Sequence, residues 1–125
     1  MGKLIFFVDD DKMILNLLEY TLKNRHEYDV KTFRSGEDCL RNIGLKPDMI
    51  VMDHYFKSNG EESMSGLKAL KEIRKFNKSL PVVILTSYGS KKLAREYLAE
   101  GAIKFITKND FFIDELMQTI DQHFS

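Results

Sequence analysis

The sequence predicts an α/β domain in which helices cover both faces of a parallel five-stranded sheet. Short apolar runs recur along the chain, and their length and continuity are typical of strands buried on both faces. Segments in which apolar residues return at helical spacing separate these runs. A chain that alternates strand and helix in this way builds a parallel sheet through right-handed crossovers.

Five segments have the composition expected of strands. In chain order they are residues 4–8, 28–33, 49–53, 82–85 and 104–107. Residues 49–53 form an apolar run that ends on a carboxylate, as expected of a central strand. Residues 28–33 alternate instead, with Tyr28, Val30 and Thr32 on one side, which is typical of an outer strand. Five strands favour the flavodoxin-like order 2-1-3-4-5, a (βα)5 three-layer sandwich.

A helix is expected after each strand. The apolar stripes that indicate these helices are Ile14, Leu17, Leu18 and Leu22; Leu40 and Ile43; Leu67, Leu70 and Ile73; Ala94, Tyr97 and Leu98; and Phe112, Ile113, Leu116, Met117, Ile120 and Phe124. The start and stop signals are one of Asp9, Asp10 and Asp11 before the first helix, Ser35 and Gly44 around the second, Ser90 and Gly101 around the fourth, and Asn109 before the fifth.

Five polar side chains are predicted to meet at one edge of the sheet. The carboxyl ends of parallel strands lie at the same edge, and in this strand order the switch point falls between the first and third strands. That edge should carry Asp9 and Asp10 after the first strand, and Asp53 at the end of the third. Thr86 and Lys108 follow the fourth and fifth strands. Carboxylates this close repel each other unless a cation lies among them, and such a group is typical of a Mg²⁺ site.

This combination of groups suits phosphoryl transfer. A carboxylate can act as a nucleophile toward phosphorus and form an aspartyl phosphate. A magnesium ion, the ammonium of Lys108 and the hydroxyl of Thr86 would then stabilise the negative charge on the outer phosphoryl oxygens. Each residue alone is a weak signal, and together they predict a phosphotransfer site.

Composition and charge set limits on the other classes of function. The chain has 125 residues, of which 43% are apolar and 30% charged, so we expect residues 1–125 to form a single domain. The formal net charge of +0 provides no general attraction to nucleic acid or anionic membranes. Cys39 is the one cysteine, which suits a reducing compartment. The first apolar run is too short for a signal peptide or a membrane span, and we expect a cytoplasmic protein.

The chain resembles a known family, the receiver domains of two-component response regulators (the CheY-like superfamily). The resemblance covers about residues 4–124 and rests on the motifs FVDDD, PDMIVMD, MSGLKAL, VVILTS and GAIKFITK. It implies that Asp53 is the phosphoacceptor and that Asp9 and Asp10 hold magnesium together with it. Thr86 matches the hydroxyl residue of the fourth strand in that family, and Lys108 matches the lysine of the fifth.

The same resemblance implies further roles and partners. Phe105 falls on the aromatic switch position, which moves together with Thr86, and Tyr55 would offer its backbone carbonyl to the metal. The phosphodonor would be a sensor histidine kinase or a phosphotransfer protein. A downstream protein or a second copy would bind the face made by the fourth helix, fifth strand and fifth helix, without direct nucleic acid or membrane binding. The receiver would catalyse only its own phosphorylation and dephosphorylation.

The chain departs from the family pattern at two places. Asn109 stands where the family typically has a proline that follows the lysine through a cis bond. The segment after the acceptor, residues 54–65, is longer than in the family and contains Glu61 and Glu62 but no proline. Both departures bear on the shape of the site and the lifetime of a phosphoryl group more than on its chemistry.

Two alternatives remain open from the sequence. In the first, Asp9 is the nucleophile and Asp11 the general acid of a haloacid-dehalogenase-like phosphatase, because Asp9-Asp10-Asp11 fits the D-x-D motif of that family. This alternative leaves Asp53 without a role. In the second, the chain is a receiver-like interaction module that is never phosphorylated.

Overall fold

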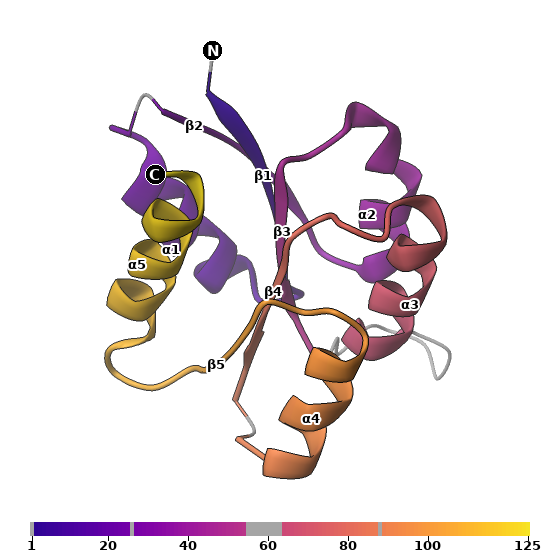
Figure 1. The fold of residues 1–125 in the computed structure, drawn as a ribbon. Helices are drawn as coiled ribbons and strands as arrows, with labels where there is room; N and C mark the ends of the chain where they lie inside the picture. The colour runs from indigo at the N-terminus through magenta and orange to yellow at the C-terminus, as the bar shows by residue number, and fades with distance from the viewer. Residues whose placement is uncertain (1, 26, 55–63, 88) are drawn as a thin grey trace.

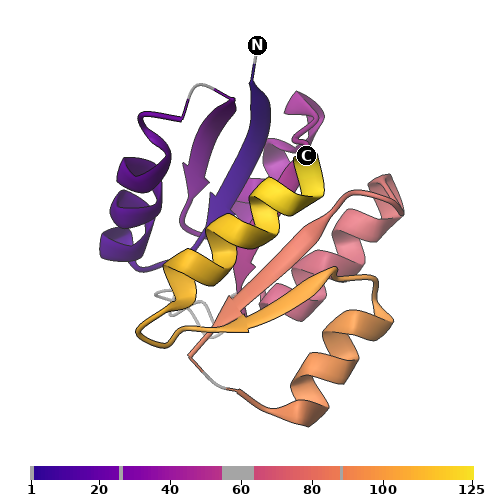
Figure 2. The ribbon, with the colours of Figure 1, turned by 60° about the vertical axis from the view of Figure 1, so that its left-hand side comes forward.

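The computed structural model of the chain describes residues 2–25, 27–54, 64–87 and 89–125. Within this part, five parallel strands form one sheet in the order β2-β1-β3-β4-β5. The strands are β1 (Lys3–Val8), β2 (Tyr28–Phe33), β3 (Met49–Asp53), β4 (Val82–Thr86) and β5 (Lys104–Thr107). The strand arrows point broadly the same way, toward one edge of the sheet (Figure 2). The predicted fold class and strand order are confirmed.

Helices cover both faces of this sheet (Figure 1). The helices are α1 (Lys12–Leu22), α2 (Gly36–Arg41), α3 (Gly66–Phe76), α4 (Lys91–Ala99) and α5 (Phe112–Phe124), and a short 3-10 helix, Ile43–Leu45, follows α2. Because side chains along a strand alternate between the two faces, β1 contributes Phe6 to the core under α2, α3 and α4 and Phe7 to the core under α1 and α5. All five residues of β3, the central strand, are buried, so Asp53 ends a fully buried strand at the carboxyl edge of the sheet.

Helix capping decides which of the three consecutive aspartates is structural. The Asp11 carboxylate accepts a hydrogen bond from the Met13 N–H at 2.9 Å and caps the N-terminus of α1. Asp9 and Asp10 are therefore left for another role. Ser35 and Ser90 cap α2 and α4, as predicted.

Three local predictions were wrong in detail. Gly44 does not end α2, because the chain continues into the 3-10 helix and Lys46 takes the left-handed conformation with φ 59°. Asn109 does not cap α5: its side chain accepts from the Phe111 N–H at 2.8 Å, and the helix begins only at Phe112. Leu17 was predicted to lie on the apolar stripe of α1, but it is 43% exposed. The helix buries Leu15, Leu18 and Leu22 instead, whose spacing of three and four residues puts them on one face.

The C-terminal end of α4 is fixed to the end of α3. Gly101 ends the helix with φ 92°, as predicted, a conformation that favours glycine. The guanidinium of Arg74 on α3 donates hydrogen bonds to the carbonyl oxygens of Glu100 at 3.0 Å and Gly101 at 2.9 Å. A third bond reaches the Leu80 carbonyl at 2.8 Å. Arg74 thus occupies two carbonyl groups that the end of α4 leaves without helical partners, and one carbonyl in the segment between α3 and β4.

The peptide bond after Lys108 differs from the cis bond that the family typically has at this place. The described residues contain no cis peptide bond, so Lys108 and Asn109 are joined by a trans bond.

No helix in the described ranges is both long enough and apolar enough to cross a membrane.

Candidate functional site

The strand register brings the predicted acidic residues together. Val8 of β1 pairs with Met52 of β3, so Asp9 and Asp53 leave the sheet side by side at its carboxyl edge. Carboxylate oxygens of Asp9, Asp10 and Asp53 all lie within 4.8 Å of one another. Asp9 is 2% exposed and Asp53 is 7% exposed. Two buried carboxylates and a third at their margin form an acidic cluster, defined here as Asp9, Asp10 and Asp53.

Lys108 extends into the acidic cluster from the end of β5. Its ammonium donates a hydrogen bond to Asp9 Oδ2 at 2.7 Å and lies 3.5 Å from Asp53 Oδ1. The Lys108 backbone N–H donates to the carbonyl of Thr86 at 2.8 Å, which ties the ends of β4 and β5 together. Thr86 is buried at the end of β4, one residue beyond Leu85, the register partner of Asp53.

Backbone N–H groups hold the two buried carboxylates in place. Asp9 Oδ1 accepts from the Asp11 N–H at 2.9 Å, and Asp53 Oδ1 accepts from the His54 N–H at 2.9 Å. The Asp9 N–H in turn donates to the carbonyl of Phe33 at 3.0 Å, at the end of β2. Backbone N–H groups next to the strand ends therefore fix these carboxylates, in addition to the side chain of Lys108.

Burial and mutual repulsion make the charged forms of these acids costly. Burial raises the pKa of Asp53 to about 6, and the negative charge of Asp9 adds to this, while Lys108 and the His54 N–H oppose it. Burial also raises the pKa of Asp9, although its hydrogen bond from Lys108 acts in the opposite direction. Burial alone would lower the pKa of Lys108, but the hydrogen bond and charges of Asp9 and Asp53 raise it.

The donor set fits a hard divalent cation. Lys108 can neutralise at most one of the three charges of the acidic cluster, and the negative charge of Asp9 adds to the effect of burial in raising the pKa of Asp53. Carboxylate oxygens in this number are the ligands that Mg²⁺ takes, with water filling its other positions. Asp9, Asp10 and Asp53 are therefore the residues that would hold the ion.

The raised pKa of Asp53 predicts a pH-dependent effect of Asp53→Asn on stability when magnesium is chelated. A raised pKa means that the fold favours protonated Asp53, so stability falls as the pH rises from about 4 through about 6. The side chain of asparagine does not ionise, so Asp53→Asn does not lose stability over this pH range. The free energy of unfolding of Asp53→Asn relative to the wild type should rise by on the order of 2 kcal/mol between about pH 4 and pH 7.

Urea unfolding at several pH values measures this difference. Adding Mg²⁺ should make this difference in stability smaller near neutral pH, because the ion stabilises the wild type more than a variant that has lost one of the three carboxylates of the acidic cluster. A difference between the two proteins that stays constant with pH would contradict the prediction.

The other predicted site residues fall into two groups. Tyr55 lies outside the described residues, as do Glu61 and Glu62. Phe105 lies on β5, paired in register with Ile84, and its ring packs against Tyr97 of α4 with ring centroids 5.9 Å apart. The structure thus places Phe105 beside the fourth helix.

Two residues near the site had no role assigned from the sequence. Nδ1 of His54 shares a hydrogen bond with the hydroxyl of Tyr97, although the two residues are 43 positions apart. The adjacency of His54 to Asp53 was the one signal in the sequence. Tyr97 carried no signal beyond its place on the apolar stripe of α4.

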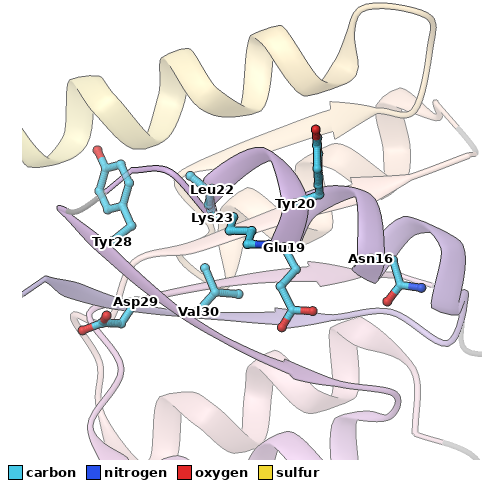
Figure 3. A pocket seen from close by; sticks show the side chains of 8 residues that line it. All are labelled: Asn16, Glu19, Tyr20, Leu22, Lys23, Tyr28, Asp29 and Val30. Atoms are coloured by element: carbon cyan, nitrogen blue, oxygen red, sulfur yellow. The ribbon is translucent and has the colours of Figure 1, made fainter.

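A groove at the other end of the sheet is a separate feature (Figure 3). Its volume is about 520 Å³, and side chains of α1 and of the first half of β2 line it. Its walls include Glu19, Lys23 and Asp29, but the acidic cluster is the one group of three metal-ligating side chains found among the described residues. The carboxyl edge of the sheet is therefore the candidate site.

Comparisons with known protein sequences agree with this geometry. A family model described as the response regulator receiver domain matches residues 5–121. The transcriptional regulatory protein ZraR of Salmonella typhimurium is 32% identical over 123 residues, which make up 97% of this chain and 26% of ZraR. The alkaline phosphatase synthesis transcriptional regulatory protein PhoP of Bacillus subtilis is 33% identical over 109 residues, 86% of this chain and 43% of PhoP. The chain spans less than half the length of these curated relatives.

Solved structures give the same result for the fold. The signal receiver domain of a putative Luxo repressor protein from Vibrio parahaemolyticus superimposes with a TM-score of 0.86 and 26% identity, over 98% of this chain and 90% of that one. The beryllofluoride-activated DrrB receiver domain superimposes with a TM-score of 0.83 and 26% identity, over 98% of this chain and 97% of that one.

Proposed function

Because this chain belongs to the response regulator receiver domain family, we propose that Asp53 is the residue on which it receives a phosphoryl group. The observation that carries the proposal is the position of Asp53: its carboxylate ends the central strand, within the acidic cluster and 3.5 Å from the Lys108 ammonium. A nucleophilic carboxylate, a fixed cation and a set of metal-binding oxygens are what phosphoryl transfer to a carboxylate needs.

The chemical step is a displacement at phosphorus. An oxygen of Asp53 forms the new O–P bond as the bond between phosphorus and the donor breaks, and the donor leaves with the electron pair. Lys108 offers its charge to the outer phosphoryl oxygens, and Thr86 offers its hydroxyl. A magnesium ion held by Asp9, Asp10 and Asp53, and by the backbone carbonyl of Tyr55 as the family resemblance implies, would supply further positive charge to the same oxygens.

This function is a signalling role rather than turnover of a separate substrate. We propose that the reactions which the chain catalyses are its own phosphorylation and dephosphorylation. Attack of water on the phosphorus of the aspartyl phosphate would release inorganic phosphate and return the Asp53 carboxylate. Lys108 and Thr86 would assist this step through the same contacts.

The phosphatase alternative is not favoured. In that reading Asp9 would attack phosphorus and Asp11 would act as the general acid. Both Asp9 oxygens already accept hydrogen bonds, one from Lys108 and one from the Asp11 N–H, and the Asp11 carboxylate caps α1. Family membership, the acidic cluster and Lys108 also weigh against an interaction module that is never phosphorylated.

Receiver domains interact with histidine kinases, and the relatives of this chain are transcriptional regulators. We propose a sensor histidine kinase or a phosphotransfer protein as the phosphodonor, in the cytoplasm. The output surface would be the α4-β5-α5 face, where Leu98 and Ile103 are exposed, and its ligand a downstream protein or a second copy. We propose that residues 1–125 act as one receiver domain that itself binds neither nucleic acid nor membrane.

The experiment that tests this function is phosphorylation by acetyl phosphate with Mg²⁺, followed by mass spectrometry. One phosphoryl group should be added, and reduction with borohydride, which converts an aspartyl phosphate to homoserine, should mark position 53. A mark at position 9 would support the phosphatase reading instead. Absence of any phosphoryl group with every donor tested, including phosphorylated histidine kinases, would support the interaction module.

A further inference from the structure

His54 follows the proposed acceptor and is held through its N–H, its carbonyl and its ring. The N–H lies 3.3 Å from the Leu85 carbonyl of β4, to which it donates a hydrogen bond. The same N–H donates to Asp53 Oδ1 at 2.9 Å, and the His54 carbonyl accepts from the Gly66 N–H at 2.9 Å, at the start of α3. Its Nδ1 shares a hydrogen bond with the Tyr97 hydroxyl. The carboxylate of Asp53, the first residue of α3 and a side chain of α4 therefore meet at this one residue.

Tyr97 connects His54 to the proposed switch position. It is 0% exposed, and its ring meets the His54 ring edge-on, with centroids 5.5 Å apart and an interplanar angle of 89°. The same ring packs against Phe105 of β5 at 5.9 Å, with an interplanar angle of 38°. A continuous series of contacts thus runs from Asp53 through His54 and Tyr97 to Phe105.

The space around the Tyr97 hydroxyl leaves little freedom. A Cβ atom added at Gly66 would lie 2.7 Å from this hydroxyl and 2.5 Å from the carbonyl oxygen of Asp53, so glycine is required there. In an interior packed this closely, neighbouring groups cannot move independently. A displacement of the His54 backbone therefore has to be accommodated by Tyr97, and through it by Phe105 and α4.

We propose that Tyr97 is a positioning residue that transmits the state of Asp53 to Phe105 and α4 through its hydrogen bond with His54. The inference rests on the proposed role of Asp53 as phosphoacceptor. A phosphoryl group on Asp53 would add negative charge and hydrogen-bond acceptors beside the His54 N–H, and so displace the backbone that Tyr97 holds. This route starts at the end of β3 and is distinct from that of Thr86, which starts at the end of β4.

The test compares the wild type with Tyr97→Phe, which removes the hydroxyl and keeps the ring against Phe105. Beryllofluoride with Mg²⁺ takes the place of the phosphoryl group, and NMR records the amide shifts. Shifts at Thr86 and Lys108, next to the site, should be retained in the variant. Those along α4 and β5 should fall by at least about twofold, because the coupling contact is lost.

Four further variants separate this coupling from a general loss of stability. Tyr28→Phe is matched, because it also removes the hydroxyl of a buried tyrosine that makes a hydrogen bond, here to Asp121 Oδ1 at 2.7 Å, far from the site. It should leave the α4 response intact. His54→Leu should reproduce the effect of Tyr97→Phe, whereas His54→Asn, whose amide can still pair with the hydroxyl, should restore part of the response. The double variant Tyr97→Phe with His54→Leu should add nothing to either single variant.

A full α4 and β5 response in Tyr97→Phe or in His54→Leu would overturn the inference, as would an equal loss in Tyr28→Phe. Acetyl phosphate should still label Asp53 in Tyr97→Phe, because Tyr97 does not contact the acceptor carboxylate. Failure of the proposed function appears differently: the wild type itself would then not be labelled at Asp53.

Discussion

Asp53→Asn is expected to abolish phosphorylation of the chain by acetyl phosphate and Mg²⁺. The amide has the shape of the carboxylate but is neutral and a far weaker nucleophile, so the O–P bond cannot form at a useful rate. The initial rate of phosphoryl incorporation should fall by at least about a thousandfold, equivalent to roughly 4 kcal/mol in the activation free energy. Intact-protein mass spectrometry over time measures this rate.

Asp48→Asn is the matched control for this loss. Asp48 lies just before β3, at the opposite end of the strand from Asp53, and its Oδ2 accepts from the Leu4 N–H at 2.8 Å. The oxygen of asparagine can accept the same hydrogen bond, so labelling should stay within about threefold of the wild type, less than 1 kcal/mol. Undiminished labelling of Asp53→Asn would refute the assignment of Asp53 as the phosphoacceptor. A phosphoryl group found on Asp9 would support the phosphatase alternative.

Asp10→Asn is expected to weaken magnesium binding by at least about tenfold, or 1.4 kcal/mol. Asp10 contributes one of the three carboxylates of the acidic cluster, and an amide oxygen is a poorer ligand for a hard divalent cation. Asp9 is less suited to this test, because its carboxylate also accepts the Lys108 hydrogen bond. Isothermal titration calorimetry with MgCl₂ would give the dissociation constant.

Asp11→Asn provides the comparison one residue further along the chain. Asparagine caps helices as well as aspartate does, so α1 should remain intact. Magnesium affinity should change by less than about threefold, since only the long-range charge is removed. The opposite pattern, in which Asp11→Asn loses affinity and Asp10→Asn keeps it, would move the metal site one position along the sequence.

The sequence alone determined the class of fold and the composition of the site. Buried strands that end on reactive groups, followed by amphipathic helices, are local patterns, because they depend on the spacing of residues within one element. The ends of parallel strands share an edge whatever their side chains are, so strand order was enough to bring Asp9, Asp10 and Asp53 together, with Lys108 beside them. This is why the proximity of these four side chains could be predicted, while their roles stay predictions.

Only the tertiary structure decided which contacts each residue at this edge of the sheet makes. Three adjacent aspartates are equivalent in sequence, and the turn into α1 makes Asp11 the cap while Asp9 pairs with Lys108. His54 and Tyr97, which form a hydrogen bond, are 43 positions apart in the chain. The residue pattern around either one does not predict this contact. Such contacts depend on where α4 packs against the end of β3, which is fixed by the combined packing of elements far apart in the chain rather than by the residues of any single one.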